Sequence, residues 1–118
     1  MNSLKVFAVQ RENKNYIQFD FEGDLTHRVA QDGIRQWENE MGKLAEGQKI
    51  NLLFNCVSML GFETEARKQW QEIMKKFKPQ IENVWVISES IFIRGAARTM
   101  GMLTGYNIKS CRSISEVE

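Results

Sequence analysis

The order in which strand-like and helix-like segments follow one another constrains the fold more than any other feature of this sequence. Two apolar stretches of strand length come first, at residues 4–9 and 16–21, with a polar turn at 11–15 between them. Three more follow at 50–56, 84–88 and 106–111. Those at 4–9, 16–21 and 84–88 are rich in β-branched or aromatic residues, which favour strands, and residues 50–56 form a nearly continuous apolar run, which is typical of a strand covered on both faces. The sequence therefore predicts five strands.

Three segments between the later strands have the spacing of helices. In residues 26–44 the apolar side chains recur every three or four positions, at Ala30, Ile34, Trp37 and Met41, which places them on one helical face. Residues 63–78 repeat this spacing and precede Pro79. A third predicted helix covers residues 91–103. A short turn beginning at residue 113 has the spacing of a capping box.

The resulting order is β-β-α-β-α-β-α-β. Strands that alternate with helices run parallel and are joined by right-handed crossovers, whereas the first two strands form an antiparallel hairpin. We therefore predict an α/β fold with a single-layer mixed sheet, an N-terminal antiparallel hairpin and helices alternating with parallel strands. A length of 118 residues is typical of one domain, covering residues 1–118.

Composition excludes several classes of protein. Sixteen Lys and Arg against fifteen Asp and Glu give a net charge of +1, which argues against a nucleic-acid partner. No apolar run approaches the roughly 20 residues that span a bilayer, so we expect a protein that is not membrane-spanning. Cys56 and Cys111 lack metal-ligand spacing and are expected to be free thiols in a reducing cytoplasm.

Catalytic signals are sparse. His27 is the only histidine, and no nucleophile stands at a matching position in the sequence. No cluster has the spacing of a metal site, and no glycine-rich loop follows a strand. We therefore expect no enzyme, no catalytic residue, no cofactor and no metal.

The central third of the chain carries a family resemblance. It lies in Ile50-Asn-Leu-Leu-Phe-Asn-Cys-Val-Ser-Met-Leu-Gly61, the helix and strand after it, and the junction Phe21-Glu-Gly-Asp-Leu25. With this element order, the chain resembles the STAS family, and most closely its stand-alone SpoIIAA-like branch, also described as STAS/Sec14-like. The resemblance implies a cytoplasmic, non-enzymatic regulatory module that binds a protein partner or itself, as a homodimer. The Sec14-like description implies an alternative, a carrier of a lipid or small apolar ligand between helices and sheet.

One departure concerns phosphorylation. Antagonist members of the family carry an Asp-Ser pair at the start of the second helix, and a kinase phosphorylates the serine. Here the corresponding stretch is Gly61-Phe-Glu-Thr64, and Thr64 is its only hydroxyl. Glu63 and Glu65 would repel a phosphate at that position. A role for Thr64 as a helix N-cap is therefore favoured over phosphorylation.

The third predicted helix has more apolar residues than one face needs, because Ile91, Phe92 and Ile93 are consecutive. Phe92 or Met102 is expected to be exposed, and exposed apolar patches often mark interfaces. We predict a partner interface formed by that helix and the turn after residue 56. Its candidate residues are Met59, Phe62, Phe92 and Met102.

A second candidate site lies at the carboxyl ends of the parallel strands, where open α/β sheets bind ligands. Hydroxyls that follow two neighbouring strands and two arginines four residues apart would form a site for a small anion or a polar head group. Its candidate residues are Ser58, Ser88, Ser90, Arg94 and Arg98. Solvated arginines on an outer helix face are the alternative interpretation.

Overall fold

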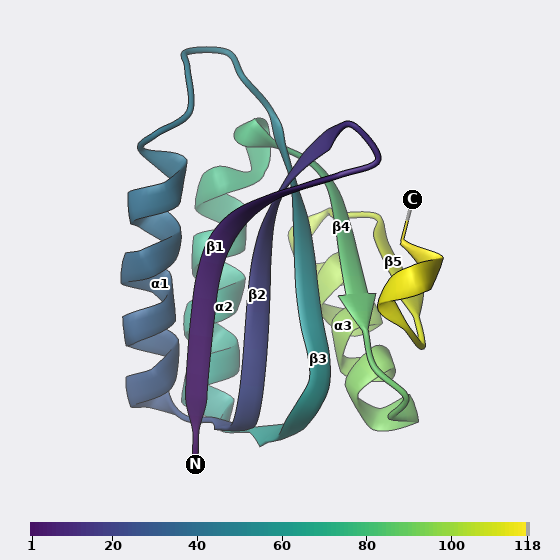
Figure 1. Cartoon of the computed structure of the whole chain (residues 1–118). Helices are drawn as coiled ribbons and strands as arrows, with labels where there is room; N and C mark the ends of the chain where they lie inside the picture. The colour runs from purple at the N-terminus through teal and green to yellow at the C-terminus, as the bar shows by residue number, and fades with distance from the viewer. Residues whose placement is uncertain (118) are drawn as a thin grey trace.

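Five strands form one mixed sheet, and three helices cover one of its faces (Figure 1). The computed structural model describes residues 1–117. The strands are β1 (Ser3–Arg11), β2 (Lys14–Leu25), β3 (Ile50–Phe62), β4 (Ile81–Ile87) and β5 (Ile108–Cys111). The helices are α1 (His27–Met41), α2 (Thr64–Phe77) and α3 (Ile91–Thr104), with short 3-10 turns η1 (Lys78–Gln80) and η2 (Ile114–Glu116).

The strand order in the sheet follows the order in the chain, β1-β2-β3-β4-β5. β1 and β2 pair antiparallel, and every later neighbour pairs parallel. Glu12 and Asn13 form the hairpin turn, both with positive φ, as a tight turn between twisted strands requires. The predicted fold class, including the antiparallel hairpin at one edge, is confirmed.

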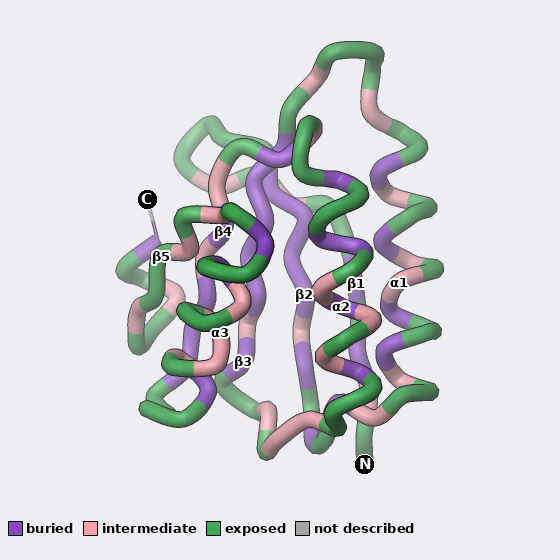
Figure 2. Tube along the Cα trace, turned by 180° about the vertical axis from the view of Figure 1, so that it is seen from behind, coloured by how far each residue is buried: buried purple, intermediate pink, exposed green. Residues whose placement is uncertain are grey.

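All three helices lie on the same face because each crossover leads from one strand to the next in the same direction (Figure 1). Figure 2 views the molecule from the helix side, and the buried stretches of each helix turn toward the sheet behind it. Aromatic rings fill this interface. The ring of Phe19 on β2 lies 5.0 Å from that of Trp37, 4.8 Å from Phe54 and 5.6 Å from Trp70, in edge-to-face geometry.

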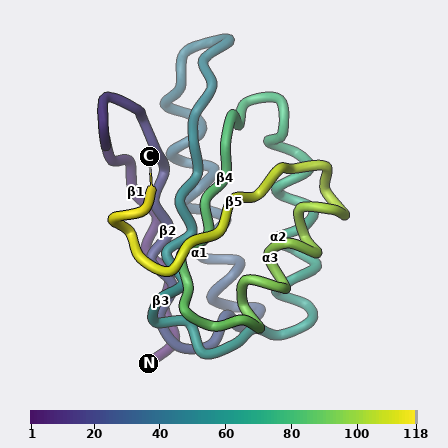
Figure 3. Tube along the Cα trace, turned by 90° about the vertical axis from the view of Figure 1, so that its right-hand side faces the viewer, coloured from purple at the N-terminus to yellow at the C-terminus, as the bar shows by residue number. Residues whose placement is uncertain are grey.

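The C-terminal segment covers part of the opposite face. Val117 packs with Tyr16, Leu53 and Ile87, whose side chains point away from the helices. Figure 3 shows this segment on the side of the sheet opposite α3. It explains why Leu53 is apolar although its side chain points away from the helices, between Leu52 and Phe54 on β3.

The central strands are longer than the sequence predicts. β2 continues past residue 21 to Leu25, and β3 continues past residue 56 to Phe62, so that Leu25 pairs with Phe62. Gly23 does not end β2, because it adopts a φ of 75° and the pairing continues across two register shifts. The predicted turn after Cys56 is therefore strand.

Helix boundaries also differ in detail. α1 ends at Met41 rather than at residue 44, because Gly42 caps it. Thr64 is the first residue of α2 and Glu63 is the N-cap, so the predicted N-cap role of Thr64 is wrong. The capping box at Ser113 and Glu116 is present and closes a single 3-10 turn. None of the helices within residues 1–117 is both long and apolar enough to cross a membrane.

Candidate functional site

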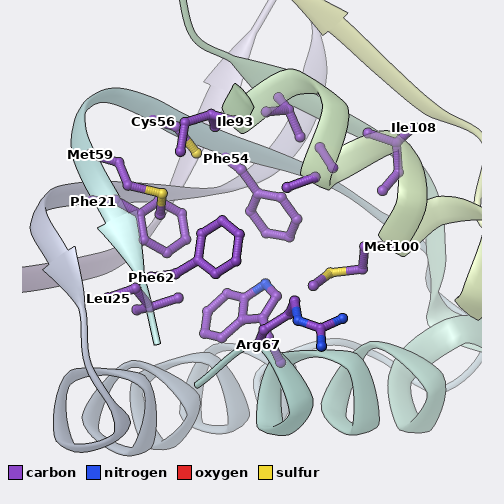
Figure 4. Close-up of a pocket in the computed structure, with 14 residues that line it drawn as sticks. Phe21, Leu25, Phe54, Cys56, Met59, Phe62, Arg67, Ile93, Met100 and Ile108 are labelled. Atoms are coloured by element: carbon purple, nitrogen blue, oxygen red, sulfur yellow. The ribbon is translucent and has the colours of Figure 1, made fainter. Parts of the chain in front are cut away.

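A pocket opens between α2, α3 and the helix-covered face of the sheet (Figure 4). Its volume is about 570 Å³ when the space open to solvent is included. Of the fourteen residues that line it, all except Arg67 are apolar. The apolar lining residues are Phe21, Leu25, Phe54, Cys56, Met59, Phe62, Trp70, Val86, Ile93, Ala96, Ala97, Met100 and Ile108.

The spacing of residues along each strand or helix decides which of their side chains reach the pocket. Phe54 and Cys56 are two apart on β3, so both point to the helix side. Arg67 and Trp70 are three apart on α2 and share one face of it. On α3 the lining residues facing α2 include Ala96 and Ala97, whose small side chains leave space that larger residues would fill.

Arg67 is half-buried, and its guanidinium has no salt bridge or hydrogen bond within residues 1–117. Glu63, one turn earlier on the same helix, is placed to pair with it. The Glu63 carboxylate instead accepts a hydrogen bond from the backbone N–H of His27 at 2.6 Å. Glu65 and Glu72 lie near Lys68 and Lys75, at 3.7 and 3.8 Å. The charge of Arg67 is therefore available to a ligand.

Cys56 lines the pocket with a protonated thiol. Burial raises its pKa from an ordinary 9.0 to about 12. At neutral pH the thiolate population is negligible, and the thiolate is the nucleophilic form. Cys56 therefore contributes apolar, polarisable surface to the pocket.

At the pocket edge the Phe62 ring stacks on the Phe92 ring, with centroids 5.6 Å apart and planes 14° apart. Phe92 is 66% exposed, and its neighbour Ile91 is 80% exposed. Leu60, two residues before Phe62 on β3, is also 80% exposed. The end of β3 and the start of α3 lie at the same end of the molecule (Figure 1). We call the neighbouring residues Ile91 and Phe92 the α3 patch.

The four predicted interface residues do not form one surface. Met59 and Phe62 line the pocket, and Phe92 stacks on Phe62. Met102 is exposed, but it lies ten residues after Phe92 on α3, about 15 Å along the helix axis. The prediction that Phe92 or Met102 is exposed agrees with the structure, because both are.

The predicted anion site is dispersed as well. The Ser88 hydroxyl is buried and accepts from the backbone N–H of Ser90, and the Ser90 hydroxyl accepts from Ile93 at the start of α3. Both serines therefore shape the turn between β4 and α3. Ser58 lines a separate polar hollow on the open face of the sheet, with Lys5 and Asp20 among its neighbours.

Arg94 and Arg98 do not line the pocket. Arg98 is exposed. Arg94 lies toward the C-terminal turn, where its positive charge affects the Glu116 carboxylate. The backbone N–H groups of Ser113 and Arg112 donate to the Glu116 carboxylate and lower its pKa, and the charges of Arg112 and Arg94 lower it further.

Thr64 and His27 both lie exposed at helix starts. Within residues 1–117, no three His, Cys, Asp or Glu side chains gather closely enough to hold a metal ion.

Sequence reasoning missed Arg67 as a site residue. Its signal was present, because Arg67 stands next to Ala66 and three residues before Trp70, at the border of the apolar face of α2. It was hidden because i,i+4 spacing to Glu63 suggests an ordinary surface ion pair.

Comparison with solved structures identifies the architecture. An uncharacterized protein of the DUF3478 family from Shewanella loihica PV-4, with a SpoIIAA-like fold, matches with a TM-score of 0.82. The match covers 98% of this chain and 91% of that chain, at 16% sequence identity. The chain has a SpoIIAA-like fold. This confirms the fold implied by the sequence resemblance. No protein-family model and no curated protein matches the sequence.

Proposed function

We propose that this SpoIIAA-like chain is a non-enzymatic binding protein that holds a small apolar ligand between α2, α3 and the sheet. The observation that carries the proposal is the pocket lining, which is apolar except for Arg67. Binding sites for small molecules are typically concave and apolar, with a few polar groups that orient the ligand. Transfer of an apolar ligand from water to this lining is favourable in proportion to the area it buries.

Two properties of the lining suit a binder. Met59 and Met100 have flexible, polarisable side chains that adapt to ligands of different shape. The lining brings together no acid–base pair, and the Cys56 thiol is a poor nucleophile at neutral pH because burial raises its pKa to about 12.

A neutral fluorescent probe tests the proposal. N-phenyl-1-naphthylamine should bind the wild-type protein with increased emission. Ala97→Phe, which fills the pocket from α3, should abolish the increase, while Ala45→Phe in the exposed loop before β3 should leave it unchanged. Ala96→Leu is a milder filling variant in case Ala97→Phe does not fold, as judged by circular dichroism. Equal probe binding by wild type and both filling variants would contradict the proposal.

A second candidate function is protein–protein binding through the α3 patch. Its support is the exposure of Ile91 and Phe92, which side by side leave a large apolar surface in water. We propose self-association as the specific form of this function. Phe92→Asp should then shift a dimer to monomer in sedimentation velocity without lowering the melting temperature. Leu103→Asp, at the other exposed end of α3, is the matched control and should remain dimeric. A monomeric wild-type protein at its highest soluble concentration would rule out self-association.

A further inference from the structure

We propose that the ligand of this pocket is a single-chain monocarboxylate, and that Arg67 binds its carboxylate. This inference rests on the proposed function and names the chemical class of the ligand. It is carried by the position of one unpaired cation at the edge of an otherwise apolar pocket.

The acidic side chains of α2 are engaged elsewhere, and Arg67 has no partner within the described residues 1–117. The Glu63 carboxylate does not pair with Arg67, because it accepts a hydrogen bond from the backbone N–H of His27 at 2.6 Å. Glu65 and Glu72 lie beside lysines on the solvent side. A half-buried cation without a partner is unfavourable in the empty protein, and its pairing with a ligand anion offsets that cost.

The arrangement of the lining sets the orientation of the ligand. Arg67 belongs to the helix layer, whereas Cys56 and Val86 belong to the buried strands β3 and β4 (Figure 4). A carboxylate beside Arg67 therefore directs the alkyl chain inward, toward the sheet. Its head remains near water and its chain contacts only apolar atoms.

The charge and shape of the guanidinium select the head group. Arginine presents a planar fork of N–H donors that matches a carboxylate with two parallel hydrogen bonds. One arginine balances one negative charge, and no second cation lines the pocket among residues 1–117, so a phosphomonoester dianion would stay partly uncompensated. The volume of about 570 Å³ includes the open mouth of the pocket, so an alkyl chain would lie along an open apolar groove rather than inside a closed cavity.

Intrinsic fluorescence provides the test. Trp70 lines the pocket and Trp37 packs 5.2 Å from it, while Trp85 lies on the opposite face of the sheet. In a Trp85→Phe background the signal comes from the pocket pair alone. We would titrate decanoate, decanol and decyltrimethylammonium at neutral pH. Decanoate should bind about 10- to 100-fold more tightly than decanol, the range expected for hydrogen bonds to a charged group.

Substitutions on α2 then assign the preference to one residue. Arg67→Gln should remove the advantage of decanoate over decanol. Arg67→Lys keeps the charge without the planar fork and should retain part of the advantage. Lys68→Gln is the matched control, because it removes one positive charge from the next position on the same helix but lies outside the pocket. Circular dichroism melting verifies that each variant folds.

The outcomes separate this inference from the proposed function. Equal affinity for decanoate and decanol, unchanged by Arg67→Gln, would overturn the carboxylate assignment and leave an apolar pocket in place. Equal losses in Arg67→Gln and Lys68→Gln would likewise overturn it, because the effect would then be one of general charge. If neither decanoate, decanol nor N-phenyl-1-naphthylamine binds, the proposed function itself is wrong.

Discussion

The carboxylate of Glu63 accepts a hydrogen bond from the backbone N–H of His27, so the N-cap residue of α2 also caps the first turn of α1. The backbone N–H of Glu63 in turn donates to the carbonyl of Leu25, the last residue of β2. Two helix starts and the ends of two strands are thereby joined at one point. The same contact keeps Glu63 away from Arg67, for which the part of the chain that the structure describes offers no other partner.

Loss of this cross-helix cap should destabilise the fold. We expect Glu63→Ala to lower the free energy of unfolding by about 1 kcal/mol, the usual cost of removing a helix cap. Urea denaturation measures this. Glu72→Gln is the control, because its pairing with Lys75 at 3.8 Å is exposed and contributes little. An equal, negligible effect of both substitutions would show that the Glu63 contact carries no stability.

α1 approaches β1 closely at Gly33, and a substitution at this glycine tests that approach. A Cβ at this position would overlap the side chain of Leu4, which is buried. Gly33→Ala gains about 1 kcal/mol of helix propensity but overpacks the interface, at a cost of about 1–3 kcal/mol. We expect a net loss of stability of about 1 kcal/mol in thermal denaturation.

Gly42, the C-cap of α1, is the matched control for that substitution. It has a φ of −65°, and a Cβ there would meet only ordinary contacts at 3.5 Å. Gly42→Ala should therefore stabilise the protein by about 0.4–1 kcal/mol, through the lower entropy of the unfolded chain. A gain in stability from Gly33→Ala of the same size would contradict the close approach of α1 to β1.

The side chain of Gln36 forms hydrogen bonds with two backbone groups at the unpaired edge of β1. Its amide oxygen accepts from the backbone N–H of Val6 at 2.9 Å, and its amide nitrogen donates to the carbonyl of Leu4 at 3.0 Å. Gln36→Leu should lower stability by about 1–3 kcal/mol, because two strand-edge groups lose their partner. It should also increase association through the freed edge. Sedimentation velocity and urea denaturation check both effects, with Gln31→Leu on the exposed face of α1 as control.

The buried thiol of Cys56 predicts a loss of stability at high pH. Burial raises its pKa from 9.0 in an ordinary environment to about 12, so between these values the native protein retains a proton that the unfolded chain releases. The free energy of unfolding should therefore fall by up to about 1.4 kcal/mol per pH unit above pH 9. Below pH 9 the thiol should have no effect on the slope.

Comparison with Cys56→Ala isolates this contribution, because other groups titrate in the same range. The difference in unfolding free energy between wild type and Cys56→Ala should change with pH only above pH 9, in urea titrations from pH 7 to 10.5. A difference that is constant with pH would show that the thiol is not shielded as its burial indicates.

Local periodicity explains why the architecture was predictable. The alternating pattern at Phe19 and Phe21 and the helical spacing of Ala30 and Trp37 each depend on neighbouring residues alone. Element ends were less predictable where pairing between strands overrides local signals. Gly23 looks like a strand end, yet β2 continues through it because β3 pairs with it as far as Phe62.

The site was only partly predictable for a related reason. The sequence predicts Met59 and Phe62 as residues of a partner interface, whereas the structure places them in the lining of the pocket. The position of Arg94 on its helix predicts it as the ligand cation, but in the structure Arg94 lies toward Glu116 and Arg67 lines the pocket instead. Which arginine points inward depends on how two helices rotate against one sheet, and sequence spacing on a single helix carries no information about that.

The sequence by itself determined the strands, the helices, their order and the mixed sheet, because right-handed crossovers leave few ways to connect such elements. Only the tertiary structure decided that α2 and α3 leave a pocket open, that the Glu63 carboxylate binds the His27 backbone, and that Arg67 lines the pocket with no partner among residues 1–117. These features depend on contacts between residues far apart in the chain. Which partner a side chain binds depends on all the groups that lie near it, and only the folded structure brings those groups together.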